Sequence, residues 1–292
     1  MRRSIFVLIF FITLNSISYS QQYKTKSPRK ILEVVVSERR FDLSGLCSAD
    51  EKWVVNADKP WNHFIYRVDS ANNQIFLENK YKLNADGRLD LEGIDYADNT
   101  FFLCDERQSR ILTYKKGETN QLELNWQNVD PARWGNAGFE GIAVDSKSNR
   151  IFLGKERDPQ LIFEVSINGG DLRQILADLT TENDFHISDM KYEKEHLFVL
   201  DRDNYRILKI DLTNQKIEGE FDYSQVLNHN EEKFYINSRY PMAEALLLTP
   251  EQLLIGLDNN GESFNEKNKW IRKAGLKGRN PVIIIFDRPK QF

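Results

Sequence analysis

The segment Asp90-Leu91-Glu92-Gly93-Ile94 recurs along the chain in related forms. Counted at the third residue of each copy, the first three spacings are 48 residues and the last is 56. A period of ~40–50 residues is typical of the blades of a β-propeller. The other copies are Asp42-Leu43-Ser44-Gly45-Leu46, Gly138-Phe139-Glu140-Gly141-Ile142, His186-Ile187-Ser188-Asp189-Met190 and Met242-Ala243-Glu244-Ala245-Leu246.

Each repeat also contains runs that have the length and residue types of strands. A second run is β-branched or aromatic, as in Phe101-Phe102-Leu103, and a third follows it, as in Ile207-Leu208-Lys209-Ile210. A fourth run is more polar, as in Gln74-Ile75-Phe76-Leu77 and Gln121-Leu122-Glu123-Leu124, which suits an outer edge strand. The first four repeats therefore each predict four strands, and the last predicts three.

The two ends of the chain complement each other in this scheme. The last repeat has no fourth run, while the apolar run Ile31 to Val36 precedes the first repeat and belongs to none. Pairing these two would leave the ring without an open edge. We therefore expect an all-β fold, a single β-propeller of five four-stranded blades closed by the N-terminal strand, with six blades as the alternative. Sandwiches and barrels also contain regularly spaced strands, but they do not require a 48-residue recurrence.

The N-terminus has the order of a secretory signal peptide. Arg2 and Arg3 precede an apolar stretch from Ile5 to Leu14, which is shorter than the ~20 residues that span a bilayer. We expect a signal peptide over residues 1–20, a linker over 21–30 and the propeller domain over 31–292. The protein would be exported to the periplasm or cell envelope. If the segment is not cleaved, it would hold the protein at the cytoplasmic membrane, and this is the one membrane contact expected.

Charge and cysteine content exclude other classes of protein. The formal net charge is −4, and the 40 Lys and Arg residues are scattered, so no nucleic-acid footprint is present in the sequence. Cys47 and Cys104 fit no zinc or redox spacing, and we expect them to be buried as small apolar side chains, with a disulfide as the less favoured alternative. We expect a monomer.

The third residue of the recurring segment would form a ring around the propeller axis. This ring contains three carboxylates, Glu92, Glu140 and Glu244, and two hydroxyls, Ser44 and Ser188. Three carboxylates that converge at low dielectric repel one another, and a bound cation would relieve that repulsion. Oxygen ligands favour calcium over magnesium, and the four histidines share no spacing for zinc. The glycines beside these carboxylates, Gly93 and Gly141, are expected where neighbouring blades pack closely.

A second ring of polar residues follows the second strand of each repeat. Acids and cations stand side by side there, so acids would bind metal and cations would bind an anionic ligand. Alternatively, each acid–arginine pair ties one blade to the next. The insertion between Asn228 and Tyr240, and the basic loop Glu262 to Arg279 with Trp270, are partner or substrate loops in this scheme. The predicted metal ligands here are Glu106 and Glu156, and the predicted ligand-binding residues are Arg107, Lys155, Arg157, Arg202, Asp203, Asp258 and Arg239.

The motif pair of Asp90-Leu91-Glu92-Gly93-Ile94 with Asp105-Glu106-Arg107, repeated as Phe139-Glu140-Gly141-Ile142-Ala143 with Lys155-Glu156-Arg157, resembles the SdiA-regulated family of bacterial envelope proteins. That family includes calcium-regulated β-propeller proteins and is distantly similar to phytase-like and esterase-like propellers. The resemblance implies a calcium-binding propeller with a phosphoester hydrolase role. It also implies Glu92, Glu140 and Glu244 as metal positions, with Glu106 and Glu156 second. Ser44 and Ser188 depart from a multi-calcium phytase centre.

Three functions remain open from the sequence. One is a calcium-dependent phosphoester hydrolase, in which the metal polarises the phosphoryl group and arginines neutralise charge. The second is a non-catalytic, calcium-stabilised propeller that binds a small anionic ligand or an envelope protein through its mouth loops. The third is a lactonase or sugar-acid hydrolase, which needs one metal and a nearby acid, with Asp203 or Asp258 as the candidate base. The sequence contains no nucleophile elbow or glycine-rich phosphate loop, so covalent catalysis has no candidate residue.

Overall fold

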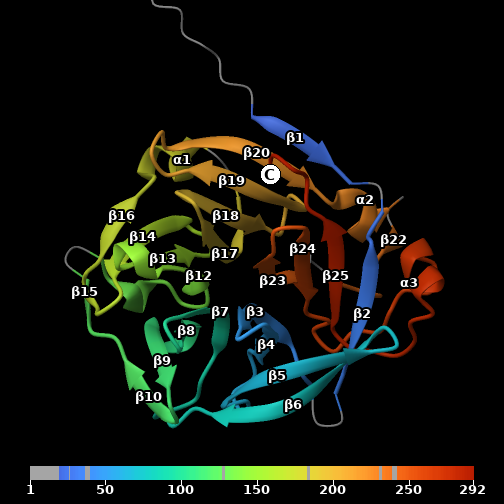
Figure 1. Cartoon of the computed structure of the whole chain (residues 1–292), viewed down its shortest axis with the longest axis horizontal. Coiled ribbons are helices and arrows are strands. Elements are labelled where there is room, and N and C mark those ends of the chain that lie inside the picture. The colour runs from blue at the N-terminus through green and yellow to red at the C-terminus, as the bar shows by residue number, and fades with distance from the viewer. Residues whose placement is uncertain are drawn as a thin grey trace, which may run out of the picture.

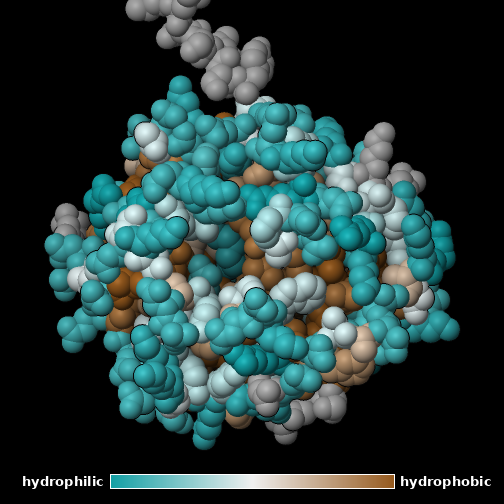
Figure 2. Space-filling model, in the orientation of Figure 1, coloured by the Kyte–Doolittle hydropathy of each residue, from teal (hydrophilic) through white to brown (hydrophobic). Residues whose placement is uncertain are grey.

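Short strands surround a central axis in the computed structural model of the chain (Figure 1). The structure describes residues 20–25, 27–36, 40–126, 129–182, 185–229, 232–238 and 242–292. The predicted signal peptide therefore lies outside the described residues, apart from Ser20. The surface of the face seen in Figure 2 is mainly hydrophilic, and hydrophobic residues are visible toward its middle.

The predicted four-stranded antiparallel unit recurs in the first four repeats, and the fifth contributes three strands of its own. The first repeat comprises β3 (Leu43–Ala49), β4 (Lys52–Ala57), β5 (Phe64–Ala71) and β6 (Gln74–Lys82). The second comprises β7 (Leu91–Ala97), β8 (Thr100–Asp105), β9 (Arg110–Lys115) and β10 (Glu118–Gln121). The third comprises β12 (Phe139–Asp145), β13 (Arg150–Lys155), β14 (Leu161–Ser166) and β16 (Arg173–Ile175). The fourth comprises β17 (Ile187–Glu193), β18 (His196–Asp201), β19 (Arg206–Asp211) and β20 (Lys216–Asp222), and the fifth β23 (Ala243–Leu248), β24 (Gln252–Leu257) and β25 (Val282–Asp287).

One outer strand differs from its predicted position. The run Gln121 to Leu124 predicts the fourth strand of the second repeat, but β10 covers residues 118–121. The chain turns earlier, because Lys116 and Gly117 both adopt positive φ, at 51° and 91°. A two-residue turn of this kind joins adjacent antiparallel strands directly, so β10 starts at once after it.

The N-terminal strand β2 (Lys30–Val35) joins the two ends of the sheet system. It pairs antiparallel with β25, where Leu32 lies opposite Ile283, and parallel with β6, where Val34 lies opposite Ile75. One sheet therefore runs in the order β23-β24-β25-β2-β6-β5-β4-β3. The last repeat thus acquires its fourth strand from the start of the chain.

The predicted linker over residues 21–30 is not a linker at its start. Strand β1 (Gln21–Lys24) pairs parallel with β20, with Gln22 opposite Glu220. The outer edge of β20 offers unpaired backbone groups, and the N-terminal segment satisfies them as a fifth strand of that sheet. Its Tyr23 ring packs edge-on against the C-terminal Phe292, with ring centroids 5.6 Å apart.

The first strands of the repeats pack against one another around the axis. Strand β3 contacts β7, β7 contacts β12, β12 contacts β17, β17 contacts β23, and β23 contacts β3. Glycine permits this approach, because a Cβ on Gly93 would lie 2.5 Å from the carbonyl oxygen of Glu140. The glycine therefore serves inter-strand packing, as the sequence predicts. The apolar core lies between successive sheets and includes buried residues such as Ile94, Ile142 and Leu246.

The remaining elements are short. The connection from β24 to β25 spans residues 258–281, whereas the equivalent connection from β8 to β9 spans 106–109. This long connection folds into α3 (Lys269–Ala274), whose first turn is capped by the Asn268 side chain and which ends at Gly275 with φ 69°. The other helices are α1 (Ala177–Glu182) and α2 (Ser224–Leu227), and the other strands are β11 (Leu124–Asn125), β15 (Gly170–Asp171), β21 (Asn228–His229) and β22 (Glu232–Lys233).

Two further expectations concern the described residues. Cys47 and Cys104 are both buried and free, as predicted. Among the helices of the described part of the chain, none combines the length and apolar character that crossing a membrane would take.

Candidate functional site

A repeated backbone hydrogen bond builds one rim of the ring. In every repeat, the residue directly after the second strand donates its backbone N–H to the carbonyl of the first residue of the recurring segment. One example is Glu106, which donates to Asp90. The five N···O distances are 2.9 to 3.2 Å. The five donors therefore occupy equivalent places around the axis, and sequence repetition becomes spatial clustering. These donors are Asp58, Glu106, Glu156, Arg202 and Asp258.

All five of these side chains line one central cavity of about 460 Å³. The predicted ring residues Ser44, Glu92, Glu140 and Glu244 line it too, whereas Ser188 does not. The cavity is polar and divides into two halves by the charges of its walls. Its remaining lining residues are Asp90, Asn136, Arg157, His186, Asp203 and Asn260.

The acidic half consists of two overlapping groups of carboxylates. Oxygen atoms of Glu92, Glu106 and Glu140 lie within 4.8 Å of one another, and so do those of Asp58, Asp90 and Glu92. Glu92, Glu106 and Glu140 are 7%, 3% and 6% exposed, so water screens their repulsion poorly. Glu92 belongs to both groups and is the centre of this half.

Burial sets the protonation of the acidic half. Burial, followed by repulsion from Glu140 and Asp58, raises the pKa of Glu92 well above its usual value. Burial likewise raises the pKa of Glu140, and repulsion from Glu106 adds to it. Burial raises the pKa of Glu106 to about 7, although the Gly138 N–H, 2.9 Å from Glu106 Oε1, opposes the shift. This half therefore favours either protons or a cation.

The other half contains cations that already have anionic partners. The guanidinium of Arg202 donates to Glu156 and to Glu244 and thereby connects the third, fourth and fifth repeats. Burial disfavours its charge, but the carboxylates of Glu244, Glu140 and Glu156 outweigh burial and raise its pKa. Glu244 thus lines the cavity with the other predicted acids but is paired with Arg202.

His186 bridges two carboxylates in this half. Its Nδ1 lies 2.9 Å from Asp203 Oδ2, and its Nε2 lies 2.5 Å from Glu156 Oε1. Burial lowers the pKa of His186, but the bonds to Asp203 and Glu156 outweigh burial and raise it. Both ring nitrogens therefore face carboxylates, which favours the protonated imidazolium, while the guanidinium of Arg202, 2.9 Å from Nε2, opposes it.

Arg157 has the most exposed cation of the cavity wall. Its side chain is 38% exposed, it pairs with Glu156, and its NH2 group donates to the carbonyl of Asn136 over 2.9 Å.

We call the acidic half the group Asp58, Asp90, Glu92, Glu106 and Glu140. We call the mixed half the group Glu156, Arg157, His186, Arg202, Asp203 and Glu244.

Two predicted ligand-binding residues, Arg107 and Lys155, do not line the cavity. Arg107 points to Asp90, 3.0 Å away, and Lys155 donates to the carbonyls of Arg157 and Pro159 and lies 5.4 Å from the Trp134 ring centroid. Lys155 is fully buried, which corrects its predicted role at the mouth. Arg239 falls outside the described residues.

One position of the repeat places two cavity residues, Asp90 and His186, that are absent from the predicted site. Asp90 and His186 both stand two positions before the third residue of the recurring segment, and both line the cavity. Comparing that position across the repeats would have identified them. Asn136, in the loop before β12, has no equivalent in the repeat pattern and could not be found this way.

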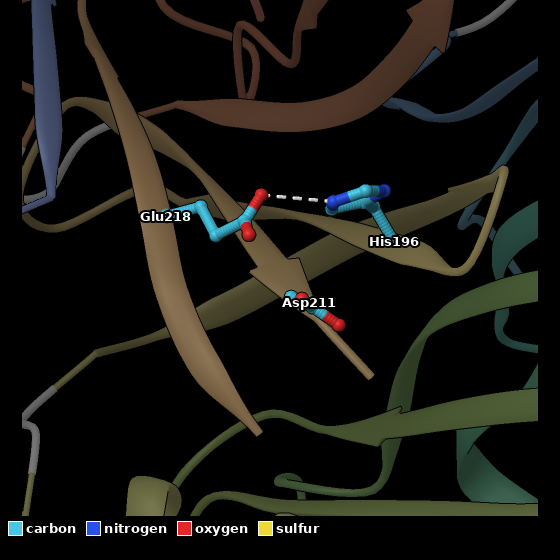
Figure 3. Close-up of side chains that lie close together, drawn as sticks. All are labelled: His196, Asp211 and Glu218. Atoms are coloured by element: carbon cyan, nitrogen blue, oxygen red, sulfur yellow. Dashed lines mark hydrogen bonds and ion pairs between the residues drawn. The ribbon is translucent and has the colours of Figure 1, made fainter. Parts of the chain in front are cut away.

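A second group of metal-ligating residues lies away from the cavity, on the outer strands of the fourth repeat. Figure 3 shows His196 and Glu218 pointing at each other, with Nε2 and Oε2 2.9 Å apart, near Asp211. The Asp211 carboxylate accepts the backbone N–H groups of Thr213 and Asn214, over 2.6 and 3.1 Å. This group is therefore a surface ion pair beside a capped turn.

Comparison with known proteins supports the family and the fold. The sequence model of a family described as SdiA-regulated matches residues 23–230, which is more than two thirds of the chain. The structure is similar to that of Myxococcus xanthus glutaminyl cyclase, with a TM-score of 0.56 and 7% identity, over 93% of this chain and 100% of that one. It is also similar to a PQQ-bound aldose sugar dehydrogenase from Streptomyces coelicolor, with a TM-score of 0.45 and 12% identity, over 90% and 100% of the two chains. The cyclase likeness supports a propeller-like fold and carries nothing about activity.

Proposed function

Because this chain belongs to the SdiA-regulated family, we propose that it is an exported, five-bladed β-propeller that binds calcium in the acidic half of its cavity and an anionic ligand beside it. The pairing of β2 with β25 and β6 supports five blades and a closed ring. The N-terminal sequence supports export to the periplasm or cell envelope.

One observation carries the calcium proposal: the buried oxygens of Glu92, Glu106 and Glu140 lie within 4.8 Å of one another. The donors are all oxygens from carboxylates, which is the set that calcium prefers. Three buried charges at this spacing are unfavourable without a cation. The residues present therefore fit calcium, with Asp58 and Asp90 as further oxygen donors at the same wall. Glu156 and Glu244, predicted as ligands from the sequence, are less suited because Arg202 pairs with both.

The mixed half supports an anionic ligand. Arg157 is the cation that faces solvent, and the carboxylates of Asp203 and Glu156 favour the imidazolium form of His186 next to it. Arg202 fixes the carboxylates around them. An anion bound between Arg157 and the acidic half would meet both a guanidinium and the metal.

Hydrolysis of a phosphoester is the activity that this pairing favours. When bound, calcium would supply the charge that polarises a phosphoryl oxygen. The chain's own part would be to orient the anion through Arg157, to neutralise charge through His186, and to exclude bulk water from the buried carboxylates. The non-catalytic alternative rests on a specific observation: Arg202 and His186 already have carboxylate partners and tie repeats together, as structural ion pairs do.

Calorimetry with calcium, on the chain from Gln21 onward, tests the metal site. We expect Glu92→Gln with Glu140→Gln to weaken calcium binding at least ~100-fold, since each lost charged ligand costs about 1.5–3 kcal/mol. The matched control is Glu118→Gln with Glu251→Gln, two exposed acids, which should leave calcium binding unchanged. Equal weakening in both pairs would contradict the site.

Phosphate monoester, diester and lactone substrates then separate the activities. Calcium-dependent turnover that is lost in the Glu92/Glu140 variant and in Arg157→Gln supports hydrolysis. Calcium binding without turnover on the whole panel supports the non-catalytic propeller. Turnover of lactones alone would support the lactonase that the sequence leaves open.

A further inference from the structure

Part of the connection between β24 and β25, residues 266–279, is strongly basic. Residues 266–279 contain six cations and one acid, a net charge of +5, whereas the whole chain carries −4. Glu266 is the one acid, and the cations are Lys267, Lys269, Arg272, Lys273, Lys277 and Arg279. Of these six, all except Lys269 are exposed, so their charges face solvent in the segment that carries α3 (Figure 1).

This segment forms a groove with the start of β2. The groove has a volume of about 270 Å³, and its lining includes three cations, Arg29, Lys30 and Lys273, but no carboxylate. Arg29 has an exposed partner, Asp287, 2.9 Å away. A groove of this size with cations on both walls suits a single phosphate or a headgroup of similar size.

An unsatisfied donor lines the same groove. Trp270 is 7% exposed and is a groove residue, and its indole Nε1 is buried without a hydrogen-bond partner. A buried donor without an acceptor costs about 1–3 kcal/mol. The ammonium groups of Lys269 and Lys273 lie 4.7 and 5.3 Å from the centroid of its ring, so the ring also positions cations. The groove wall thus combines a cation, Lys273, with a buried residue, Trp270, whose N–H has no acceptor.

We propose that this groove binds the phosphate of an anionic phospholipid and that the basic face around α3 docks the protein on a membrane surface. Each exposed Lys or Arg near an anionic leaflet contributes about 1 kcal/mol, and the interaction weakens beyond a Debye length. The five exposed cations of residues 266–279 are therefore sufficient for reversible binding. The docking is independent of residues 1–20 and differs from the tether that an uncleaved N-terminus would provide.

Co-sedimentation with lipid vesicles tests the proposal. The chain from Gln21 onward, which contains all the strands and helices described here, would be mixed with vesicles of phosphatidylcholine alone or with one quarter phosphatidylglycerol. We expect binding to the anionic vesicles alone, and a steep loss of binding when the salt rises from 0.05 to 0.5 M. Equal binding to both vesicle types would overturn the proposal.

Charge reversal localises the surface. Arg272→Glu with Lys273→Glu and Lys277→Glu should weaken vesicle binding at least ~100-fold, from ~1 kcal/mol for each cation. The matched control, Lys115→Glu with Lys147→Glu and Lys216→Glu, reverses three exposed lysines on other repeats and should change binding less than ~3-fold. Unchanged melting temperatures would establish that both variants fold. Equal loss in both would show a general charge effect and contradict the site.

Two further experiments test the role of the groove itself. Trp270→Phe keeps an aromatic ring but removes the indole N–H, and we expect ~3-fold to 10-fold weaker binding, the worth of one hydrogen bond. Glycerol phosphate at 10 mM should displace little protein from the vesicles, because it can occupy the groove but does not contact the exposed cations around it. Binding of glycerol phosphate without any binding of vesicles would assign the groove to a soluble phosphate and overturn membrane docking.

Discussion

On one side of the central cavity, Glu92, Glu106 and Glu140 face one another, whereas on the other side Arg202 lies between Glu156 and Glu244. Residues at equivalent positions of successive repeats form both sides. The two sides differ because one repeat has another residue type at one of these positions. In the fourth repeat an arginine stands where the second and third have glutamates. The acidic half is therefore left in need of a cation, while the mixed half already contains one. Equivalent positions of the repeats can therefore form a candidate binding site on one side and the ion pairs that join the repeats on the other.

The largest expected effect comes from removing the cation of the mixed half. Arg202→Met removes the arginine that pairs with Glu244 and one of the partners of Glu156, which should lower the free energy of unfolding by about 3 kcal/mol. Urea unfolding at pH 7.5 measures it. The exposed Arg133→Met, whose partner is Asp130, is the control and should change stability by less than ~0.5 kcal/mol. A loss at Arg202 no larger than at Arg133 would remove the distinction between the halves.

The second effect is a pH dependence that calcium reverses. The pKa of Glu106, about 7, and that of Asp58, about 6, are both raised by burial, so the folded protein binds more protons than the unfolded chain between pH ~4.5 and 7. Without calcium, stability should be greatest below that window and fall as the pH rises through it. Melting temperatures in EDTA and in excess calcium measure this. With calcium, which requires deprotonated ligands, stabilisation should grow with pH instead.

A smaller effect of opposite sign belongs to the acidic half. Glu92→Gln removes one of the repelling charges, so in EDTA at pH 8.5 it should raise the free energy of unfolding by about 1 kcal/mol. At lower pH, where burial favours the protonated form of this carboxyl, the gain should shrink. A destabilised variant at pH 8.5 would show that Glu92 is a structural group like Glu156.

The smallest effect concerns the group in Figure 3. His196→Gln removes an ion pair in which Glu218 is 43% exposed, so stability should change by less than ~0.5 kcal/mol. Calcium titration should be the same as for the unchanged protein. A lost calcium site in this variant would move the metal from the cavity to the outer strands.

The sequence predicts much of the fold because the repeat and the strand pattern agree. Spacing alone places Glu92, Glu140 and Glu244 around one axis, and the apolar run at Ile31 predicts a partner for β25. The burial of Lys155 and the bridging role of His186 depend on how side chains fill the cavity, which periodicity does not specify. Strand β1 was missed because Gln21–Lys24 is polar, and its pairing with β20 uses backbone groups that composition does not report.

Strand β2 has a consequence for how the molecule is made. Its antiparallel partner, β25, is the last strand of the chain, so some 250 residues separate two halves of one hydrogen-bonded ladder. During synthesis or translocation β2 can pair with β6 early, but its edge toward β25 must wait until the final residues emerge. The pairing of β2 with β25 is then a late folding step between residues far apart in the sequence. Such contacts raise the contact order and slow folding. A tag or truncation at either terminus would act on the same event.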